Sequence, residues 1–388
     1  MIPYKDLTKE QQGGYDLAYS RLRSGEDVTV IGGFAGVGKS TVLAALSDML
    51  PSQTHYCCYT GRAANLLRQK MPDKTSCIST IHSLIYRSKK DDRENIIGWR
   101  KRQHLEDVDL IVIDEVSMVD DPLWKDLKSY GIPILAFGDH GQLPPVSGNS
   151  VFGTHLDYML THIHRQAEGN PIIALSRTIR EEGVLPTINA GDDRLLQLTP
   201  EQANDAILQM YKGLPWGEIA TLTYTNRTRL GLNKWLRGEF GSKEAWVGEG
   251  DIVICLRNDQ DAGIFNGMRG EVTKARKFDK WHSKATIHFP ADDLTLSLKL
   301  FHPQLATAKT FSKIEHIETV TGGDINGWDQ VGDLFSYGWA MTVHKMQGDQ
   351  VDTIVLAYEY PSLVSQEDFT RWAYTAVTRA VRRLVVVR

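Results

Sequence analysis

The stretch VTVIGGFAGVGKST (28–41) decides how the first part of this 388-residue chain is interpreted. Its apolar start predicts a buried strand, and the residues from Gly33 to Ser40 match the pattern GxxxxGK[ST] in full. A strand that leads through such a loop into a helix is typical of phosphate-binding loops, whose backbone N–H groups surround an anion. The stretch therefore predicts a nucleotide site in an α/β fold.

The side chains of this loop have distinct expected roles. Lys39 should neutralise charge on the β- and γ-phosphates, and the Ser40 hydroxyl should be a ligand of Mg²⁺. The residues expected to bind the nucleotide are Gly33, Ala35, Gly36, Val37, Gly38, Lys39, Ser40 and Thr41. A chance glycine-rich turn is the alternative, and the strand–loop–helix context argues against it.

Further apolar runs alternate with helical segments along the chain. THYCCYT (54–60), LIVIDEV (110–116) and IPILAFGD (132–139) predict three more buried strands. Such an alternation favours a parallel sheet covered by helices on both faces. A second α/β run begins near Glu218 and resumes near the C-terminal end of the chain. Short β-like runs from Glu249 to about Leu300 predict a small β-rich insertion between them, of the barrel type.

Two carboxylates, Asp114 and Glu115, end the apolar strand LIVID. An Asp at this position can hold Mg²⁺ opposite Ser40, and the neighbouring Glu can orient and deprotonate an attacking water. A cap for the following helix is the structural alternative. Together with the upstream loop, the pair predicts a hydrolase of nucleoside triphosphates. The two motifs alone do not say what the hydrolysis drives, since kinases, clamp loaders, transporters and motors share them.

Composition sets further limits. Hydrophobic residues make up 41% of the chain and the formal net charge is −4, so bulk charge does not attach it to nucleic acid, although a local basic groove would suffice. No apolar run reaches the ~20 residues that span a bilayer, and the first residues carry no apolar signal core. We expect a soluble, cytoplasmic protein of a bacterial or phage-infected cell.

The order of motifs along the chain is more specific. GFAGVGKST, YTGRAA, STIHSL, IDEVSM, GDHGQLPPV, HIHRQ, TYTNRT, MTVHKMQG and YTAVTRA follow one another over nearly the whole sequence. This series resembles the superfamily 1 helicases, and most closely the RecD-like branch that includes the small phage Dda-type helicases.

The resemblance implies an architecture. Residues 1–165 would form a first RecA-like domain with a pin insertion at about 84–107, and residues 166–240 and 336–388 a second one. Residues 241–335 would form an SH3-like insertion. ATP would bind between the two RecA-like domains.

The resemblance also implies further nucleotide contacts. Arg165 and Arg379 would reach the γ-phosphate and stabilise charge as it leaves, and Gln11 would read adenine. Gln347 and Gly348 would face the nucleotide from the second domain.

A third implication is a path for DNA across both domains. The residues that match its motifs are Thr60, Gly61, Arg62, Thr80, His82, Pro144, Thr225, Asn226, Thr342, Val343 and His344. Hydroxyls and backbone N–H groups suit phosphate oxygens and do not read sequence. The pin segment 86–104 holds seven Lys/Arg against three Asp/Glu, and Trp99 within it would stack on a base. A solvated charged loop is the alternative for this segment.

Given this resemblance, we expect GDHGQLPPV (138–146) to couple ATP hydrolysis to DNA binding. Gln142 can donate one hydrogen bond and accept another, so it can detect the γ-phosphate or the attacking water without adding charge. The prolines after Leu143 restrict φ, and the turn should transmit a change at Gln142 toward the DNA.

These interpretations together predict an ATP- and Mg²⁺-dependent DNA helicase that moves 5′ to 3′ on single-stranded DNA and unwinds forked duplex. Its expected partners are DNA and a single-stranded-DNA-binding protein, and its expected state is a monomer. Two alternatives stay open: a translocase that displaces proteins, and a P-loop ATPase switch that does not translocate.

Overall fold

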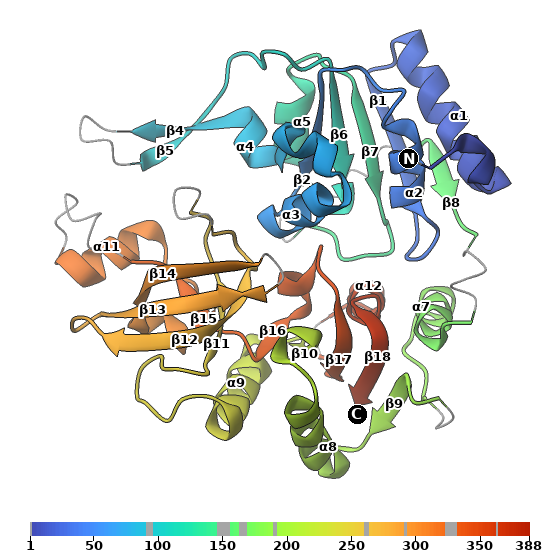
Figure 1. Cartoon of the computed structure of the whole chain (residues 1–388). Helices are drawn as coiled ribbons and strands as arrows, with labels where there is room; N and C mark the ends of the chain where they lie inside the picture. The colour runs from blue at the N-terminus through green and yellow to red at the C-terminus, as the bar shows by residue number, and fades with distance from the viewer. Residues whose placement is uncertain are drawn as a thin grey trace. The chain divides into compact units, whose positions relative to one another are not determined.

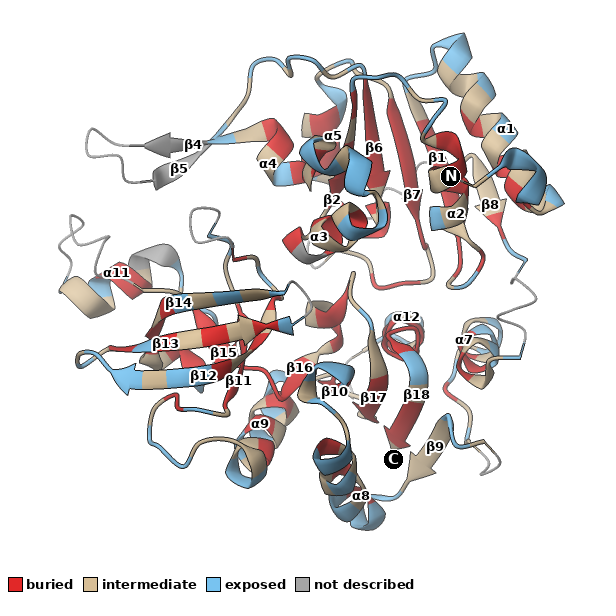
Figure 2. Cartoon of the chain, viewed as in Figure 1, coloured by how far each residue is buried: buried red, intermediate tan, exposed pale blue. Residues whose placement is uncertain are grey.

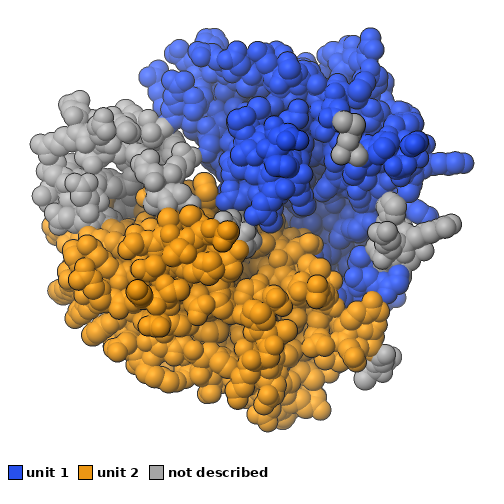
Figure 3. All heavy atoms as spheres, in the orientation of Figure 1, with its two compact units in different colours: residues 1–185, 365–378 blue, residues 186–364, 379–388 orange. Residues whose placement is uncertain are grey.

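The computed structural model describes residues 2–90, 96–145, 156–162, 169–188, 192–259, 264–290, 293–322, 332–361 and 364–388. The chain divides by packing into two compact units (Figure 3). Unit 1 comprises residues 1–185 and 365–378, and unit 2 comprises residues 186–364 and 379–388. The packing thus groups residues 365–378 with the first part of the chain, whereas the motif order groups them with the second.

Unit 1 is built on a six-stranded parallel sheet in the order β3-β2-β6-β7-β1-β8 (Figure 1). The strands are β1 (Val28–Gly33), β2 (Thr54–Cys58), β3 (Ile78–Thr80), β6 (Leu110–Asp114), β7 (Ile134–Gly138) and β8 (Tyr158–Leu160). The central strands are buried along almost their whole length (Figure 2), as continuous apolar runs require in a covered parallel sheet.

The helices of unit 1 follow these strands. They are α1 (Lys9–Ser24), α2 (Lys39–Leu46), α3 (Gly61–Lys70), α4 (Ile81–Ile85), α5 (Asp121–Lys128), α7 (Pro171–Glu182) and α12 (Gln366–Val377), with short 3₁₀ turns η1 (Tyr4–Asp6), η2 (Pro72–Cys77) and η3 (Val116–Met118). Threonine hydroxyls cap α1, α3 and α4 at Thr8, Thr60 and Thr80. Such caps satisfy N–H groups that the first turn of a helix leaves without a partner.

An antiparallel hairpin projects from unit 1 next to α4 (Figure 1). It consists of β4 (Tyr86–Lys90) and β5 (Ile96–Lys101), with Tyr86 opposite Lys101. Its base is attached to α5, because the Tyr86 hydroxyl and Lys101 Nζ both donate to the carboxylate of Asp126, over 2.5 and 3.0 Å. The predicted pin segment is therefore a β-hairpin rather than a structureless loop.

Unit 2 contains a second parallel sheet, in the order β16-β10-β17-β18-β9. Its strands are β9 (Leu195–Leu198), β10 (Ile219–Thr223), β16 (Ala340–Thr342), β17 (Val351–Ala357) and β18 (Ala380–Val387). The other elements are α8 (Pro200–Gly213), α9 (Asn226–Phe240), η5 (Trp216–Glu218) and η8 (Val343–Met346). The predicted α/β class with parallel sheets is confirmed.

An antiparallel sheet in the order β14-β13-β12-β11-β15 forms the β-rich part of unit 2. It comprises β11 (Ile252–Cys255), β12 (Arg269–Lys277), β13 (His282–Phe289), β14 (Leu294–Phe301) and β15 (Phe335–Tyr337), with α10 (His302–Leu305) and α11 (Lys313–Thr321). Alternate side chains such as Ala285, Ile287 and Leu298 enter its core. In the described part of the chain, no helix is long and apolar enough to cross a membrane.

Candidate functional site

The phosphate loop has the backbone that its glycines predict. Gly36 and Gly38 have φ values of +81° and +85°, in the left-handed region that favours glycine. At Gly38 a Cβ would also collide with Nε2 of Gln11. Lys39 Nζ donates to the carbonyl oxygens of Gly33 and Phe34 over 2.7 and 3.1 Å, so its ammonium group lies inside the loop.

Gln11 lies against the same loop. Its Nε2 donates to the carbonyl of Val37 over 3.0 Å, and its Oε1 accepts from the N–H of Thr8 over 3.0 Å. The side chain is buried, and in this structure it connects the start of α1 to the loop. Reading of adenine by Gln11 stays a prediction, and it would require Gln11 to exchange one of these partners for the base.

The strand order brings three predicted segments to one edge of the sheet. All six strands are parallel, so their carboxyl ends share an edge, and β7 lies between β6 and β1. Asp114 ends β6 and Glu115 follows it, the turn from Asp139 to Gln142 follows β7, and the phosphate loop begins at the end of β1. The carboxyl edge of such a sheet is the usual place for a ligand site in α/β proteins.

The two carboxylates at the end of β6 are in unusual surroundings. Burial raises the pKa of Asp114, and the positive charge of Lys39 is the largest opposing influence on it. Glu115 has a φ of +59°, a conformation that costs a non-glycine residue free energy and that occurs often at active sites. Both features are typical of a site built for chemistry.

Asp139 is the centre of a buried hydrogen-bond network. Its Oδ1 accepts from the N–H of Gly141 over 2.9 Å, and its Oδ2 accepts from the hydroxyl of Tyr374 over 2.7 Å. That hydroxyl in turn accepts from the N–H of Ala35 in the phosphate loop, over 2.9 Å. Tyr374 therefore joins the phosphate loop to the turn after β7, a role that sequence reasoning missed.

Gln142 lies within the same network. It is 5% exposed, and its Nε2 donates weakly to Asp139 Oδ2 over 3.4 Å. Its Oε1 has no hydrogen-bond partner among the described residues, so it can accept from a bound water. The next residue, Leu143, donates its N–H to Thr375 Oγ1 over 2.9 Å, which ties the LPP turn to α12.

The predicted DNA contacts of unit 1 other than Pro144 lie at the β2 and β3 end of the same sheet edge. Thr60 follows β2 and Thr80 ends the neighbouring strand β3, and their hydroxyls accept from the N–H groups of Ala63 and Ser83. Gly61 begins α3, and His82 is exposed between the rings of Tyr59 and Tyr86. Pro144 is partly buried in the turn after β7. Two helix starts side by side suit phosphate groups.

Unit 2 presents a similar edge. The ends of β10 and β16 are adjacent, with Thr223 opposite Thr342. Thr225 caps α9, which Asn226 begins, and the Thr225 hydroxyl donates to Glu359 over 2.9 Å. Val343 is fully buried, so a direct DNA contact by it stays a prediction, and burial lowers the pKa of His344.

The nucleotide contacts predicted for unit 2 lie beside this edge. Gln347 is buried, and Gly348 has a φ of +78°. Arg379 is also buried, and its Nη1 donates to the carbonyl of Asp349, over 3.2 Å. The structure therefore groups Arg379 with the loop that ends MTVHKMQG.

Three predicted residues cannot be placed in this way. Arg165 lies outside the described residues, and the side chains of Arg62 and Trp99 are not described, although their backbones belong to α3 and β5. Their roles stay predictions.

The donor set at the edge of unit 1 fits Mg²⁺. Ser40 offers an exposed hydroxyl at the start of α2, and Asp114 offers a carboxylate at the end of β6. Mg²⁺ prefers oxygen ligands, and it typically takes one or two protein groups and completes its shell with phosphates and water.

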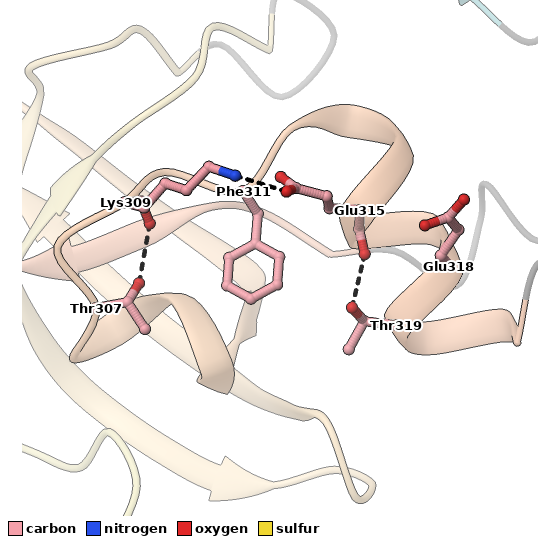
Figure 4. Close-up of a pocket in the computed structure, with 6 residues that line it drawn as sticks. All are labelled: Thr307, Lys309, Phe311, Glu315, Glu318 and Thr319. Atoms are coloured by element: carbon pink, nitrogen blue, oxygen red, sulfur yellow. Dashed lines mark hydrogen bonds and ion pairs between the residues drawn. The ribbon is translucent and has the colours of Figure 1, made fainter.

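A pocket in unit 2 is a different kind of site. Figure 4 shows its lining, which consists of Thr307, Lys309, Phe311, Glu315, Glu318 and Thr319. Lys309 Nζ donates to Glu315 over 2.7 Å, and the Thr307 and Thr319 hydroxyls donate to backbone carbonyls. None of the predicted site residues lines it.

Two family models match the chain. Residues 7–195 match an AAA domain, and residues 337–387 match the UvrD-like helicase C-terminal domain. Among curated proteins, an ATP-dependent RecD2 DNA helicase of Deinococcus radiodurans is 30% identical over 97% of this chain and 48% of its own length. The ATP-dependent DNA helicase dda of Enterobacteria phage T4 is 28% identical over 46% of this chain and 44% of its length. The chain thus spans about half the length of such relatives.

Solved structures share the fold. A Pif1 helicase from Bacteroides, in complex with ADP-AlF3 and ssDNA, aligns with a TM-score of 0.58 at 19% identity. The alignment covers 98% of this chain and 92% of that one. A Pif1 helicase from Candida albicans aligns with a TM-score of 0.54 at 18% identity, over 98% and 94% of the two chains.

Proposed function

We propose that this chain, a member of the RecD-like branch of superfamily 1 helicases, is an ATP-dependent motor that moves 5′ to 3′ along single-stranded DNA and unwinds forked duplex. The observation that carries the proposal is the carboxyl edge of the unit 1 sheet. The phosphate loop lies at one part of that edge, and the helix starts capped by Thr60 and Thr80 lie at another. Because both parts belong to one sheet, hydrolysis of the nucleotide can change how tightly the edge binds the phosphates of the DNA backbone.

The hydrolytic step follows from the residues at this edge. Lys39 and the loop N–H groups bind the β- and γ-phosphates, and Glu115 accepts a proton from the attacking water. Gln142 holds that water or the γ-phosphate through its unpartnered Oε1 and its weakly bonded Nε2. Arg165 and Arg379 stabilise the charge of the leaving phosphoryl group, an effect worth roughly 10³–10⁵ in rate for arginine fingers. Ser40 and Asp114 would hold Mg²⁺, which when bound would neutralise charge on the phosphates.

Coupling to DNA is assigned to the turn after β7. The turn connects Gln142 to Leu143, and the Leu143 N–H is bound by Thr375 of α12. A change at Gln142 on hydrolysis therefore displaces a proline-stiffened segment and α12 together. Alternating grip by the Thr60/Thr80 edge and the Thr225/Thr342 edge then gives net movement along the strand.

The finer architecture belongs to the same proposal. The two parallel sheets are RecA-like domains, the β4–β5 hairpin is the pin that splits duplex, and the antiparallel sheet of unit 2 is an SH3-like insertion. The chain acts as a monomer on single-stranded and forked DNA, alongside a single-stranded-DNA-binding protein, in the cytoplasm.

The test is hydrolysis of ATP with and without single-stranded DNA. The intact chain should hydrolyse ATP much faster with saturating DNA. Lys39→Ala should abolish hydrolysis and keep DNA binding, because the ammonium group serves the phosphates and not the DNA edge. Lys125→Ala, on the exposed side of α5, is the matched control and should behave like the intact chain. A rate that DNA leaves unchanged would exclude the motor and favour an ATPase switch.

A further inference from the structure

The outer face of the antiparallel sheet of unit 2 carries a row of like charges. Arg276 of β12 lies opposite Lys284 of β13, and Lys284 lies opposite Lys299 of β14. Side chains directly opposite one another on neighbouring strands are ~5 Å apart, and like charges in such pairs destabilise a sheet. Three cations in one row therefore cost folding free energy when no anion is bound.

Strand alternation determines which way these side chains point. Ala285, Ile287, Leu298 and Leu300 belong to the buried core of this sheet. The residues between them therefore point to the opposite face, which Figure 2 shows as partly exposed. A second row on this face consists of Lys274, Thr286 and Ser297.

An exposed aromatic ring stands within the row of cations. Phe278, in the turn between β12 and β13, is 47% exposed. The ammonium groups of Lys284 and Lys299 lie 4.3 and 5.5 Å from its ring centroid. The two cations hold this ring in place by cation–π contact, and its remaining surface is open to solvent.

The nearby carboxylates are bound to other groups. Asp279 accepts from His282 Nδ1 over 2.9 Å and from the N–H groups of Trp281 and His282. Glu271, at the far end of the face, accepts from Trp216 Nε1 over 2.7 Å. Burial lowers the pKa of Lys299 and Lys284 lowers it further, against the opposing charges of Asp279 and Asp333. The cations of the face, Lys274, Arg276, Lys284 and Lys299, outnumber the carboxylates of Glu271, Asp279 and Asp333, so the face has an excess of positive charge.

We propose that this basic face, which comprises Lys274, Arg276, Phe278, Lys284 and Lys299, binds a single strand of DNA. The cations and the hydroxyls of Thr286 and Ser297 take the phosphates, and the ring of Phe278 stacks on a base. Stacking requires an unpaired base, which selects a single strand over a duplex. The choice of DNA among polyanions rests on the proposed function. The face is separate from the Thr225/Thr342 edge, so it gives unit 2 a second surface that binds DNA.

Photocrosslinking tests the contact directly. The full chain is irradiated with a long dT oligonucleotide that carries 4-thiothymidine, and the crosslinked peptides are identified by mass spectrometry. Crosslinks within residues 274–284 are expected. An excess of unlabelled dT should remove them, and an equal excess of blunt duplex should not. Their absence, or equal competition by duplex, would overturn the proposal.

Equilibrium binding gives an independent measurement. Phe278→Ala should weaken binding of the same oligonucleotide by roughly 5- to 100-fold, the range for one stacked base. The double variant Lys284→Glu/Lys299→Glu should reduce the slope of log affinity against log salt by about 0.7 for each lost phosphate contact. Lys212→Glu, an exposed lysine of α8, is the matched control and should keep the slope of the intact chain. A double variant that matches this control would overturn the proposal.

ATP hydrolysis by the intact chain separates this proposal from the function itself. If DNA stimulates hydrolysis but residues 274–284 do not crosslink, the basic face alone is wrong. If these residues crosslink but DNA leaves hydrolysis unchanged, the motor is wrong and the face stands.

Discussion

A single hydroxyl group, that of Tyr374, connects the elements of the candidate nucleotide site. It accepts from Ala35 N–H in the phosphate loop and donates to Asp139, which also holds Gly141 and Gln142. The ring lies so close to Gly141 that a Cβ there would come within 3.2 Å of it. We therefore expect a change in the loop on phosphate binding to alter the contacts of the turn and of α12.

Removal of this hydroxyl should uncouple the site. In Tyr374→Phe, the Ala35 N–H and one Asp139 oxygen lose a partner, which costs about 1–3 kcal/mol of stability. Misplacement of the loop should lower the DNA-stimulated rate of hydrolysis by about 10- to 100-fold. Steady-state hydrolysis and thermal denaturation measure the two effects.

Tyr211 provides the matched control. Its buried hydroxyl is bonded to Thr221 Oγ1 and to the carbonyl of Trp339, each over 3.0 Å, in unit 2. Tyr211→Phe should lose comparable stability and keep the stimulated rate. Equal rates for the two variants would show that Tyr374 is only a packing residue.

The sequence could predict much of this site at the residue level. Lys39, Asp114 and Gln142 lie in short motifs, and parallel strands must bring their carboxyl ends to one edge. Tyr374 was missed because its partners are 235 and 339 residues away, and no local pattern indicates which turn a buried hydroxyl will contact. Tyr374 is the first residue of the YTAVTRA motif, but the resemblance assigns a role only to Arg379 within it.

Elements with long apolar runs were the predictable ones. The central strands β1, β6 and β7 coincide with the runs expected from the sequence. β3 and β8 span three residues each, which is too short for a periodic pattern. The packing of α12 could not be predicted either, since amphipathicity shows that one face is buried but not against what. The helix packs against α7 of unit 1.

The β-rich element of unit 2 should make the protein sensitive to acid. His316 of α11 is fully buried on the ring of Phe301, and neither ring nitrogen has a hydrogen-bond partner among the described residues. Burial, with Arg257, His282 and Lys299 nearby, lowers its pKa to about 3. The folded state thus binds fewer protons than the unfolded chain below pH 6.5, and stability falls as the pH falls.

Substitution of this residue tests the acid sensitivity. At pH 5 the protonation of unfolded His316 should cost about 2 kcal/mol of unfolding free energy relative to neutral pH. His316→Leu should remove this pH-dependent loss of unfolding free energy. The denaturation midpoint of the variant should therefore fall less between pH 7.5 and pH 5 than that of the intact chain. Asp333, whose burial raises its pKa to about 6, contributes with the opposite sign and is present in both proteins. Parallel curves for the two proteins would contradict the assignment.

At the scale of the whole molecule, the chain crosses between its two units around α12. It runs from β17 of unit 2 into α12 of unit 1 and returns to unit 2 at Arg379 and β18. Arg379 lies two residues after α12 ends, so in the proposed mechanism a nucleotide-dependent movement of α12 should shift Arg379 through the backbone. This connection gives the proposed motor a covalent route from hydrolysis to the second DNA edge.

The most direct measurement of the central claim is the unwinding of forked duplexes that carry a single 5′ tail or a single 3′ tail. With ATP, the intact chain should separate the fork with the 5′ tail and leave the other intact, and Lys39→Ala should separate neither. Separation of only the 3′-tailed fork would contradict the direction of movement. Failure on both forks, with hydrolysis unaffected by DNA, would contradict the motor.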